Sequence, residues 1–130
     1  MPPTEPPPLP TEAELEVLQV LWERGPSTVR DVHDRLIESR KVRYTTALKL
    51  MQNLSAKGLV RRNDSQRSHV FESAVERSAI EARLVERFVD GVFKGSTGRL
   101  VLRALATRPA STEELGEIRR IARRMDEEDG

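Results

Sequence analysis

Cysteine is absent from the 130 residues, and aromatic residues make up only 4% of them. Without cysteine the chain has no disulfide framework, thiolate metal site or cysteine nucleophile. The few rings argue against a large aromatic ligand pocket. No apolar run approaches the roughly 20 residues of a membrane span, and the N-terminus lacks a basic region followed by an apolar run. We therefore expect a cytoplasmic protein with no membrane insertion, cofactor or metal.

Catalytic signatures are scarce as well. The two histidines, His33 and His69, fall on different predicted elements, with no acidic pair near either. His33 is predicted to be a surface residue of a helix, and His69 an exposed residue at the start of a strand. Residues 95–98, Gly-Ser-Thr-Gly, lack the lysine and the preceding strand of a phosphate-binding loop, so we interpret them as a helix break. The chain is not expected to be an enzyme.

Acidic residues are nearly missing from one stretch. Between Arg40 and Arg67 eight of nine charged residues are basic, which gives a local net charge of +7, whereas the whole chain carries only +1. A local positive field on a nearly neutral protein favours a polyanionic partner. Double-stranded DNA is the partner that this charge distribution predicts.

The same stretch contains a predicted helix from about Tyr44. Ala47, Leu50, Met51 and Leu54 recur with the spacing of one apolar helix face. The opposite face is polar and free of acids, as suits contacts with phosphates and base edges. The predicted DNA-binding side chains are those of Arg43, Thr45, Thr46, Lys49, Gln52, Asn53, Lys57, Arg62 and Arg67.

Two strand-like runs follow this helix. Gly58 is suited to end it in the left-handed conformation, and residues 59–63 and 69–72 read as strands joined by a turn at 64–68. Upstream, residues 11–24 and a segment capped by Ser27 or Thr28 read as two more helices, the first with a Thr11/Glu14 capping box. This order, three helices followed by two strands, is that of a winged helix-turn-helix domain.

The chain divides into three predicted parts. Residues 1–10 form a proline-rich tail that we expect to be disordered, and residues 11–73 form the winged helix. Residues 74–130 read as helices with more apolar surface than they can bury among themselves, which predicts self-association. The expected fold is mainly α with a small β-wing, plus a C-terminal helical dimerisation domain. The predicted dimerisation residues are Ile80, Leu84, Phe88, Val92, Phe93, Leu102, Leu105, Leu115 and Ile118.

Several stretches together resemble the penicillinase and methicillin-resistance repressors, a family that includes copper-responsive members. They are LEVL at 15–18, TVRDV at 28–32, YTTALK at 44–49, KGLV at 57–60 and FVDGVFKGS at 88–96. The resemblance implies a homodimeric repressor that binds a near-palindromic operator and dimerises through its C-terminal helices. It also implies that Thr45, Thr46 and Lys49 lie on the recognition helix and Arg67 on the wing.

The departures from the family pattern concern the inducing signal. Copper-responsive members carry a cysteine-rich C-terminal motif, which this chain lacks. The antibiotic-resistance repressors are inactivated by cleavage at an Asn-Phe bond in the dimerisation domain, and the corresponding pair here is Arg103-Ala104. The resemblance therefore gives Arg103-Ala104 as the candidate cleavage site and a membrane sensor-protease as the candidate partner.

Two other functions stay open from the sequence. The basic face of a winged helix also serves as a protein-interaction module that docks on an acidic partner. A small-molecule-responsive regulator with a ligand pocket between the two domains is the other alternative. An acid-free array of Thr, Lys, Gln and Asn on one helix favours DNA over an acidic protein.

Overall fold

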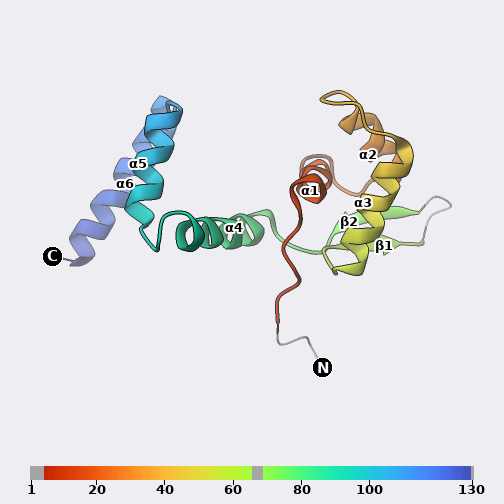
Figure 1. Ribbon diagram of the computed structural model, residues 1–130, viewed down its shortest axis with the longest axis horizontal. Coiled ribbons are helices and arrows are strands. Elements are labelled where there is room, and N and C mark those ends of the chain that lie inside the picture. Colours follow the sequence, from red (N-terminus) through yellow and green to blue (C-terminus); the bar gives the residue numbers. More distant parts are fainter. Residues whose placement is uncertain (1–4, 66–68, 130) are drawn as a thin grey trace. The chain divides into compact units, whose positions relative to one another are not determined.

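The described part of the chain, residues 5–65 and 69–129 of a computed structural model, is mostly helical. In chain order its elements are α1 (Glu12–Arg24), α2 (Val29–Leu36), α3 (Tyr44–Ala56), β1 (Val60–Asn63), β2 (Val70–Ser73), α4 (Arg77–Gly91), α5 (Thr97–Thr107) and α6 (Thr112–Asp129). They belong to two units, the first ending at Val85 and the second beginning at Glu86 within α4. Figure 1 labels these elements.

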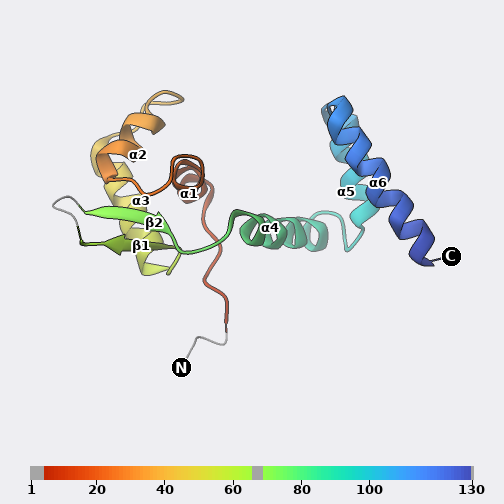
Figure 2. The same ribbon diagram turned by 180° about the vertical axis from the view of Figure 1, so that it is seen from behind.

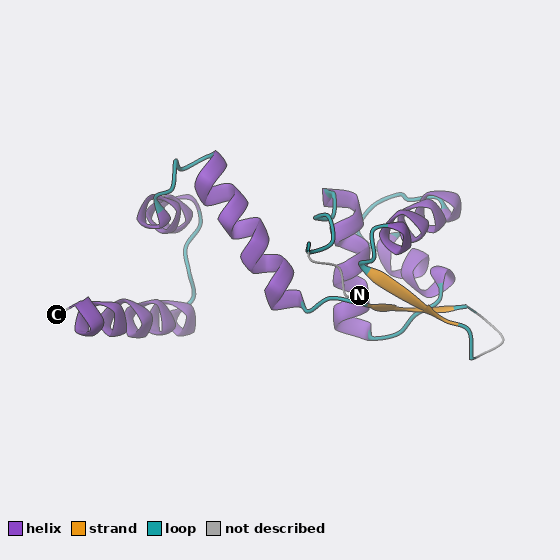
Figure 3. Ribbon diagram, turned by 90° about the horizontal axis from the view of Figure 1, so that it is seen from below, coloured by secondary structure: helices purple, strands orange, loops and turns teal. Residues whose placement is uncertain are grey.

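The first unit is a winged helix, which confirms the predicted fold. Helices α1, α2 and α3 pack against one another, and the antiparallel pair β1–β2 lies beside α3 (Figure 3). Seen from behind, β2 lies between β1 and α1 (Figure 2). Fully buried apolar side chains from all three helices make the core. Those with no exposed surface are Val17, Leu18, Val32, Ala47, Met51, Leu54 and Leu59.

Local signals account for several element boundaries. Thr11 and Glu14 form the predicted capping box at the start of α1, and Thr28 with Asp31 forms a second one at α2. Gly58 follows α3 with a positive φ of 79°, a conformation that glycine adopts at no steric cost.

The wing is fastened to the helices at two places. Ser27 and Phe71 exchange backbone hydrogen bonds of 2.9 and 2.8 Å. The indole Nε1 of Trp22 donates to Ser73 Oγ at 3.0 Å and to the Val75 carbonyl at 3.2 Å. Both contacts join the second wing strand to the first half of the domain, so they hold the wing at a set position beside α3.

An ion pair joins the start of α1 to the end of α3. Lys57, just after α3, donates to the Glu14 carboxylate in the first turn of α1, whose side chain is only 3% exposed. The same Glu14 oxygen accepts the Thr11 backbone N–H at 2.8 Å. Burial raises the pKa of Glu14, but the hydrogen bonds from Lys57 and Thr11 outweigh it, so its pKa lies below its ordinary value.

A carboxyl whose pKa falls on folding stabilises the protein above its unfolded-state pKa, and this stability is lost as the pH falls through its folded-state pKa. We therefore expect Glu14→Gln to lower the free energy of unfolding by about 2 kcal/mol at pH 7, the range of charge-assisted hydrogen bonds. The deficit should shrink below about pH 4. Urea unfolding at several pH values measures it.

Glu16→Gln on the same helix is the matched control. Glu16 pairs with Arg40 at 3.2 Å, but both side chains are partly exposed. Such a pair contributes about 0–1 kcal/mol, so the control should be nearly neutral. A Glu14→Gln variant whose deficit at pH 7 equals that of Glu16→Gln would contradict the assigned role of Glu14.

Candidate nucleic-acid interface

Helix α3 presents one polar face to solvent. Thr45, Thr46, Lys49 and Gln52 are exposed, and Asn53 is half-buried. The opposite face supplies Ala47, Met51 and Leu54 to the core, each fully buried. Burial of the apolar face therefore fixes how the helix is rotated and turns the acid-free array outward.

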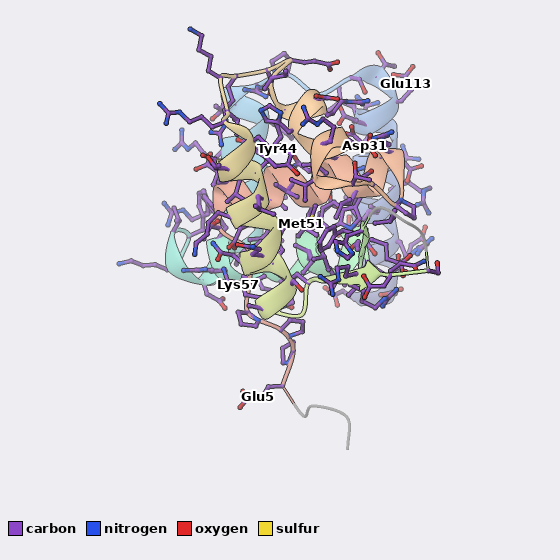
Figure 4. All side chains as sticks on the ribbon, turned by 90° about the vertical axis from the view of Figure 1, so that its right-hand side faces the viewer. Glu5, Asp31, Tyr44, Met51, Lys57 and Glu113 are labelled. Carbon is purple, nitrogen blue, oxygen red and sulfur yellow. The ribbon has the colours of Figure 1, made fainter. Side chains whose placement is uncertain are left out.

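The N-terminus of α3 is uncapped, unlike that of α1 or α2. Arg43 occupies the N-cap position, its side chain makes no capping hydrogen bond, and the first turn contains no acid. The first backbone N–H groups of a helix lack partners within the helix and carry the positive end of its dipole. This end of α3 therefore leaves backbone donors available to an anion, beside the Arg43 side chain. Figure 4 shows Tyr44 at this end of the helix and Lys57 at the other.

The turn that leads into α3 is held by His33, which we wrongly expected from the sequence to be a plain surface residue. Its Nε2 lies 2.6 Å from the Val42 carbonyl oxygen. Its ring packs edge-on against Tyr44, with ring centroids 5.8 Å apart. A histidine at this place therefore positions the first residue of α3. The spacing of His33 along its own helix gave no hint of this partner nine residues later.

An open groove of about 740 Å³ runs between the start of α2, one side of α3 and the wing. Arg30 lies over the Tyr44 ring, with its guanidinium carbon 5.1 Å from the centroid, so the two side chains form one wall. Gln52 and Ser55 of α3 line the floor, and Arg62 lines the wing side. Arg30 and Tyr44 were not among the residues predicted from the sequence, because Arg30 lies outside the basic stretch and Tyr44 carries no charge.

Some of the cations between Arg40 and Arg67 are paired with acids, several of them from outside that stretch. Arg40 pairs with Glu16, Arg61 with Glu72 at 3.3 Å, Arg62 with Asp64 at 2.8 Å, and Lys57 with Glu14. Among residues 5–65 and 69–129, no carboxylate lies within 4.0 Å of Lys41, Arg43 or Lys49. Unpaired positive charge therefore gathers at the start and middle of α3.

Two of the predicted DNA-binding residues, Lys57 and Arg67, are not part of the exposed face of α3 described above. Lys57 is directed to the buried Glu14 rather than to the exposed face of α3, so we leave it out of the candidate interface. Sequence patterns do not reveal this contact, because 43 residues separate the two partners. Arg67 lies outside the described residues, and its place on the wing stays a prediction.

The predicted dimerisation residues fall into two groups. Ile80 is 1% exposed and belongs to the core of the first unit, and Leu84 packs partly against that core. Ile80 is therefore not available to a partner, contrary to the prediction from the sequence. Phe88, Val92 and Leu102 are 56%, 59% and 70% exposed. The half-buried members are Phe93, Leu105, Leu115 and Ile118.

The candidate cleavage pair lies in the second unit, on α5. Arg103 and Ala104 are both exposed on α5. In residues 5–65 and 69–129 no group of three or more His, Asp or Glu side chains is arranged to hold a metal ion. Within that same part of the chain, every helix is too short or too polar to traverse a bilayer.

Comparison with known proteins identifies relatives of this chain. The penicillinase repressor family matches residues 10–124. The methicillin resistance regulatory protein MecI of Mammaliicoccus sciuri is 26% identical over 111 residues, which cover 85% of this chain and 90% of that protein. The transcriptional regulator BlaI of Mycobacterium tuberculosis (strain CDC 1551 / Oshkosh) is 35% identical over 75 residues, covering 57% of this chain and 54% of that one.

Solved structures agree on the fold. The monomeric form of Bacillus licheniformis BlaI, determined in complex with the blaP half-operator, gives a TM-score of 0.50 at 23% identity over 56% of this chain and 89% of that chain. A MarR family protein from Bacillus stearothermophilus gives 0.53 at 20% identity over 91% of this chain and 74% of its own. The family match spans both units of the fold described above, and the chain therefore belongs to the penicillinase repressor family.

Proposed function

We propose that this chain is a sequence-specific DNA-binding transcriptional repressor. The observation that carries the proposal is the exposed, acid-free face of α3, together with the uncapped N-terminus of the same helix. An acidic protein partner does not require such an array, whereas base edges and phosphates do. Its relative from Bacillus licheniformis was solved with a half-operator, which supports the same use of the fold.

In this proposal α3 enters the major groove. Thr45, Thr46, Lys49 and Gln52 meet base edges and nearby phosphates. The groove beside α3 then receives one phosphate strand, with Arg30 and the wing residue Arg62 on its two sides. Arg43 and the free N–H groups at the start of α3 contact a second phosphate.

The matched pair Lys49→Gln and Lys57→Gln tests this orientation. Both variants remove one positive charge at α3 or directly after it, but only Lys49 lies on the proposed DNA face. We expect Lys49→Gln to weaken operator binding by about 1–3 kcal/mol and to lower the salt slope by roughly one unit. Lys57→Gln should keep both values near those of the wild type, because Lys57 is directed to Glu14 and away from the proposed DNA face. Fluorescence anisotropy with operator DNA at several salt concentrations measures both.

Thr46→Ala tests base readout without a change of charge. The side chain is exposed, so folding should be nearly unaffected. We expect a loss of about 1–3 kcal/mol of operator affinity, with no change in binding to random DNA. Equal weakening on both DNAs would instead assign Thr46 to the phosphate backbone, and wild-type affinity would remove it from the interface.

We further propose that the repressor acts as a homodimer on a near-palindromic operator. In the described part of α5 and α6 no residue is buried, although both helices carry apolar side chains. An exposed apolar stripe consists of Val85 and Phe88 on α4 and Val92 directly after that helix. Surfaces of this kind in a soluble chain favour burial against a second copy. A two-fold dimer then reads two related half-sites.

Induction by proteolysis is the remaining element of the proposal. Arg103-Ala104 lies on an exposed part of α5, where a protease that first unwinds the helix can reach it. Cleavage there separates α6 from α4 and removes the dimer while leaving the winged helix intact. A membrane sensor-protease is the proposed partner. The appearance of a fragment that ends at Arg103 in induced cells supports this route, and intact protein in fully derepressed cells contradicts it.

A further inference from the structure

Helix α6 is divided into zones of opposite charge. Its first two turns carry Glu113, Glu114 and Glu117, and its last turn carries four consecutive acids, 126–129. Between them lie four arginines and no acid. They are Arg119, Arg120, Arg123 and Arg124. Surface helices usually intersperse the two signs to gain pairs within the helix, so this separation needs another explanation.

The arginine zone is exposed and largely unpaired. Arg120 pairs with Glu117 at 2.8 Å. In the described part of the chain, Arg119, Arg123 and Arg124 have no carboxylate within 4.0 Å. Together with Gly116 and Glu127, the four arginines line a shallow groove of about 470 Å³.

Gly116 lies inside the helix, where glycine costs about 1 kcal/mol relative to alanine. Nothing lies within 4 Å of the position where its Cβ would stand. The missing side chain therefore leaves the floor of the arginine groove open to a partner.

The acidic end of α6 lacks compensating positive charge. Its last turn contains no basic residue, so its acids face the negative end of the helix dipole. Arg123 and Arg124 lie four residues before Glu127 and Glu128, but this order of charges is the weaker one, and neither pair forms. Cations from outside the helix would stabilise this end.

DNA does not suit the arginine zone as a partner. Seven acids and four arginines give α6 a net charge of −3, and acids flank the arginines on both sides. A phosphate backbone would be repelled along most of the helix. A second helix with the same zones can lie antiparallel to α6, displaced toward the C-terminus of α6. Its acidic end then lies against the arginines of α6. Its own arginines then meet the acidic end of the first helix.

We propose that the arginine zone of α6 binds the acidic C-terminal turn of α6 from a second copy, in an antiparallel pair. The inference rests on the proposed homodimer and adds the contact that aligns its two C-terminal helices. Two-fold symmetry makes each contact occur twice. Ile121, within the arginine zone, and Met125, between that zone and the acidic turn, are 45% and 61% exposed and supply the apolar part of the contact. A parallel pair in register would set like charges together, so the charge zones also select the orientation.

Reciprocal charge reversal tests the contact. One full-length variant carries Arg123→Glu and Arg124→Glu, and the other carries Glu127→Arg and Glu128→Arg. Each alone should weaken dimerisation by roughly 10- to 100-fold at low salt, because several pairs become repulsive in both halves of the dimer. An equimolar mixture should restore association as a heterodimer. Analytical ultracentrifugation with one labelled variant measures this, and circular dichroism checks the helix content.

The outcomes separate this inference from the proposed function. A wild-type chain that stays monomeric at all concentrations tested overturns the homodimer itself. If the wild type is a dimer and either variant dimerises as tightly as it does, only the α6 contact is overturned. The same holds if the mixture of the two variants forms no heterodimer. If a variant does not fold, the salt dependence of the wild-type dimer decides. Its dissociation constant should rise between roughly 50 and 500 mM salt, because salt screens exposed charge pairs, and a constant value rejects the contact.

Discussion

Fragment 1–85 is expected to bind operator DNA about 100- to 10,000-fold more weakly than the full-length chain at one fixed salt concentration. The fragment keeps the whole of the first unit, including α3 and the wing. It loses residues 86–91 of α4 together with α5 and α6, which carry most of the proposed dimer surface. Two winged helices joined in a dimer make the second half-site contact intramolecular, and this gain in effective concentration disappears in the fragment.

The position of the cut matters because the first unit does not end with the wing. Ile80 is 1% exposed and sits in the core of that unit, and Leu84 packs partly against it. A fragment ending at residue 76 would lose both side chains, at a cost of about 2–5 kcal/mol for a buried Ile alone. Fragment 1–85 retains them, so its weaker binding reports the loss of the dimer rather than the loss of the fold.

Half-operator DNA provides the control for this comparison. On a single half-site the fragment and the full-length chain should bind with similar affinity and similar salt dependence, because each uses one recognition surface. Equal affinities on the complete operator would reject the dimer-coupled mechanism. They would also remove the physical basis for control by cleavage in α5.

Local sequence patterns were sufficient for most of the fold. The apolar spacing of Ala47, Met51 and Leu54 correctly predicted the buried face of α3, because helix periodicity depends only on neighbours in the sequence. The predicted capping pair Thr11/Glu14 is formed, for the same reason. The predicted strands agree with β1 and β2 to within one residue at each end.

Contacts between distant parts of the chain could not be predicted in this way. Lys57 was assigned to DNA because it lies among other cations, but its partner is 43 residues away and became visible only in the fold. Arg30 at the start of α2 lies over the ring of Tyr44 at the start of α3, a contact that neither the charge of Arg30 nor the position of Tyr44 in the sequence predicts. The groove they line depends on the angle between two helices, which periodicity does not contain.

The apolar pattern of α4 was misleading for a related reason. Ile80 and Phe88 lie on the same helix, and their residue types are equally suited to a core and to an interface. The structure distinguishes them by exposure, 1% for Ile80 and 56% for Phe88. Burial within one protomer is thus the information that the sequence lacked.

Phe88→Asp is expected to convert the proposed full-length dimer into a monomer. Phe88 on α4 forms an exposed stripe with Val85 on the same helix and with Val92 directly after it, and the proposed dimer would bury this stripe. A carboxylate without a partner in that apolar contact costs several kcal/mol, and by symmetry the cost occurs twice, so the dissociation constant should rise by roughly 1,000-fold or more. Sedimentation equilibrium over a range of protein concentrations measures the change.

Ala79→Asp provides the matched control. It introduces the same charge on the same helix, but nine residues earlier, which places it roughly half a turn around α4 from Phe88. Ala79 is exposed and lies in the first turn of α4, where the helix dipole tolerates a carboxylate. This variant should dimerise as the wild type does. If it dissociates like Phe88→Asp, added negative charge rather than a buried Phe88 side chain is responsible.

The Phe88→Asp monomer should also remain a folded winged helix. Phe88 is outside the core of the first unit, so the thermal unfolding of that unit should be nearly unchanged. Its operator affinity should therefore equal that of fragment 1–85, because both proteins carry one intact recognition surface and no partner. The point variant and the truncated fragment share only the loss of the dimer. Equal operator affinities of the two proteins would therefore attribute their difference from the wild type to dimerisation. A Phe88→Asp dimer, or a monomer that binds the operator as tightly as the wild type, would contradict that attribution.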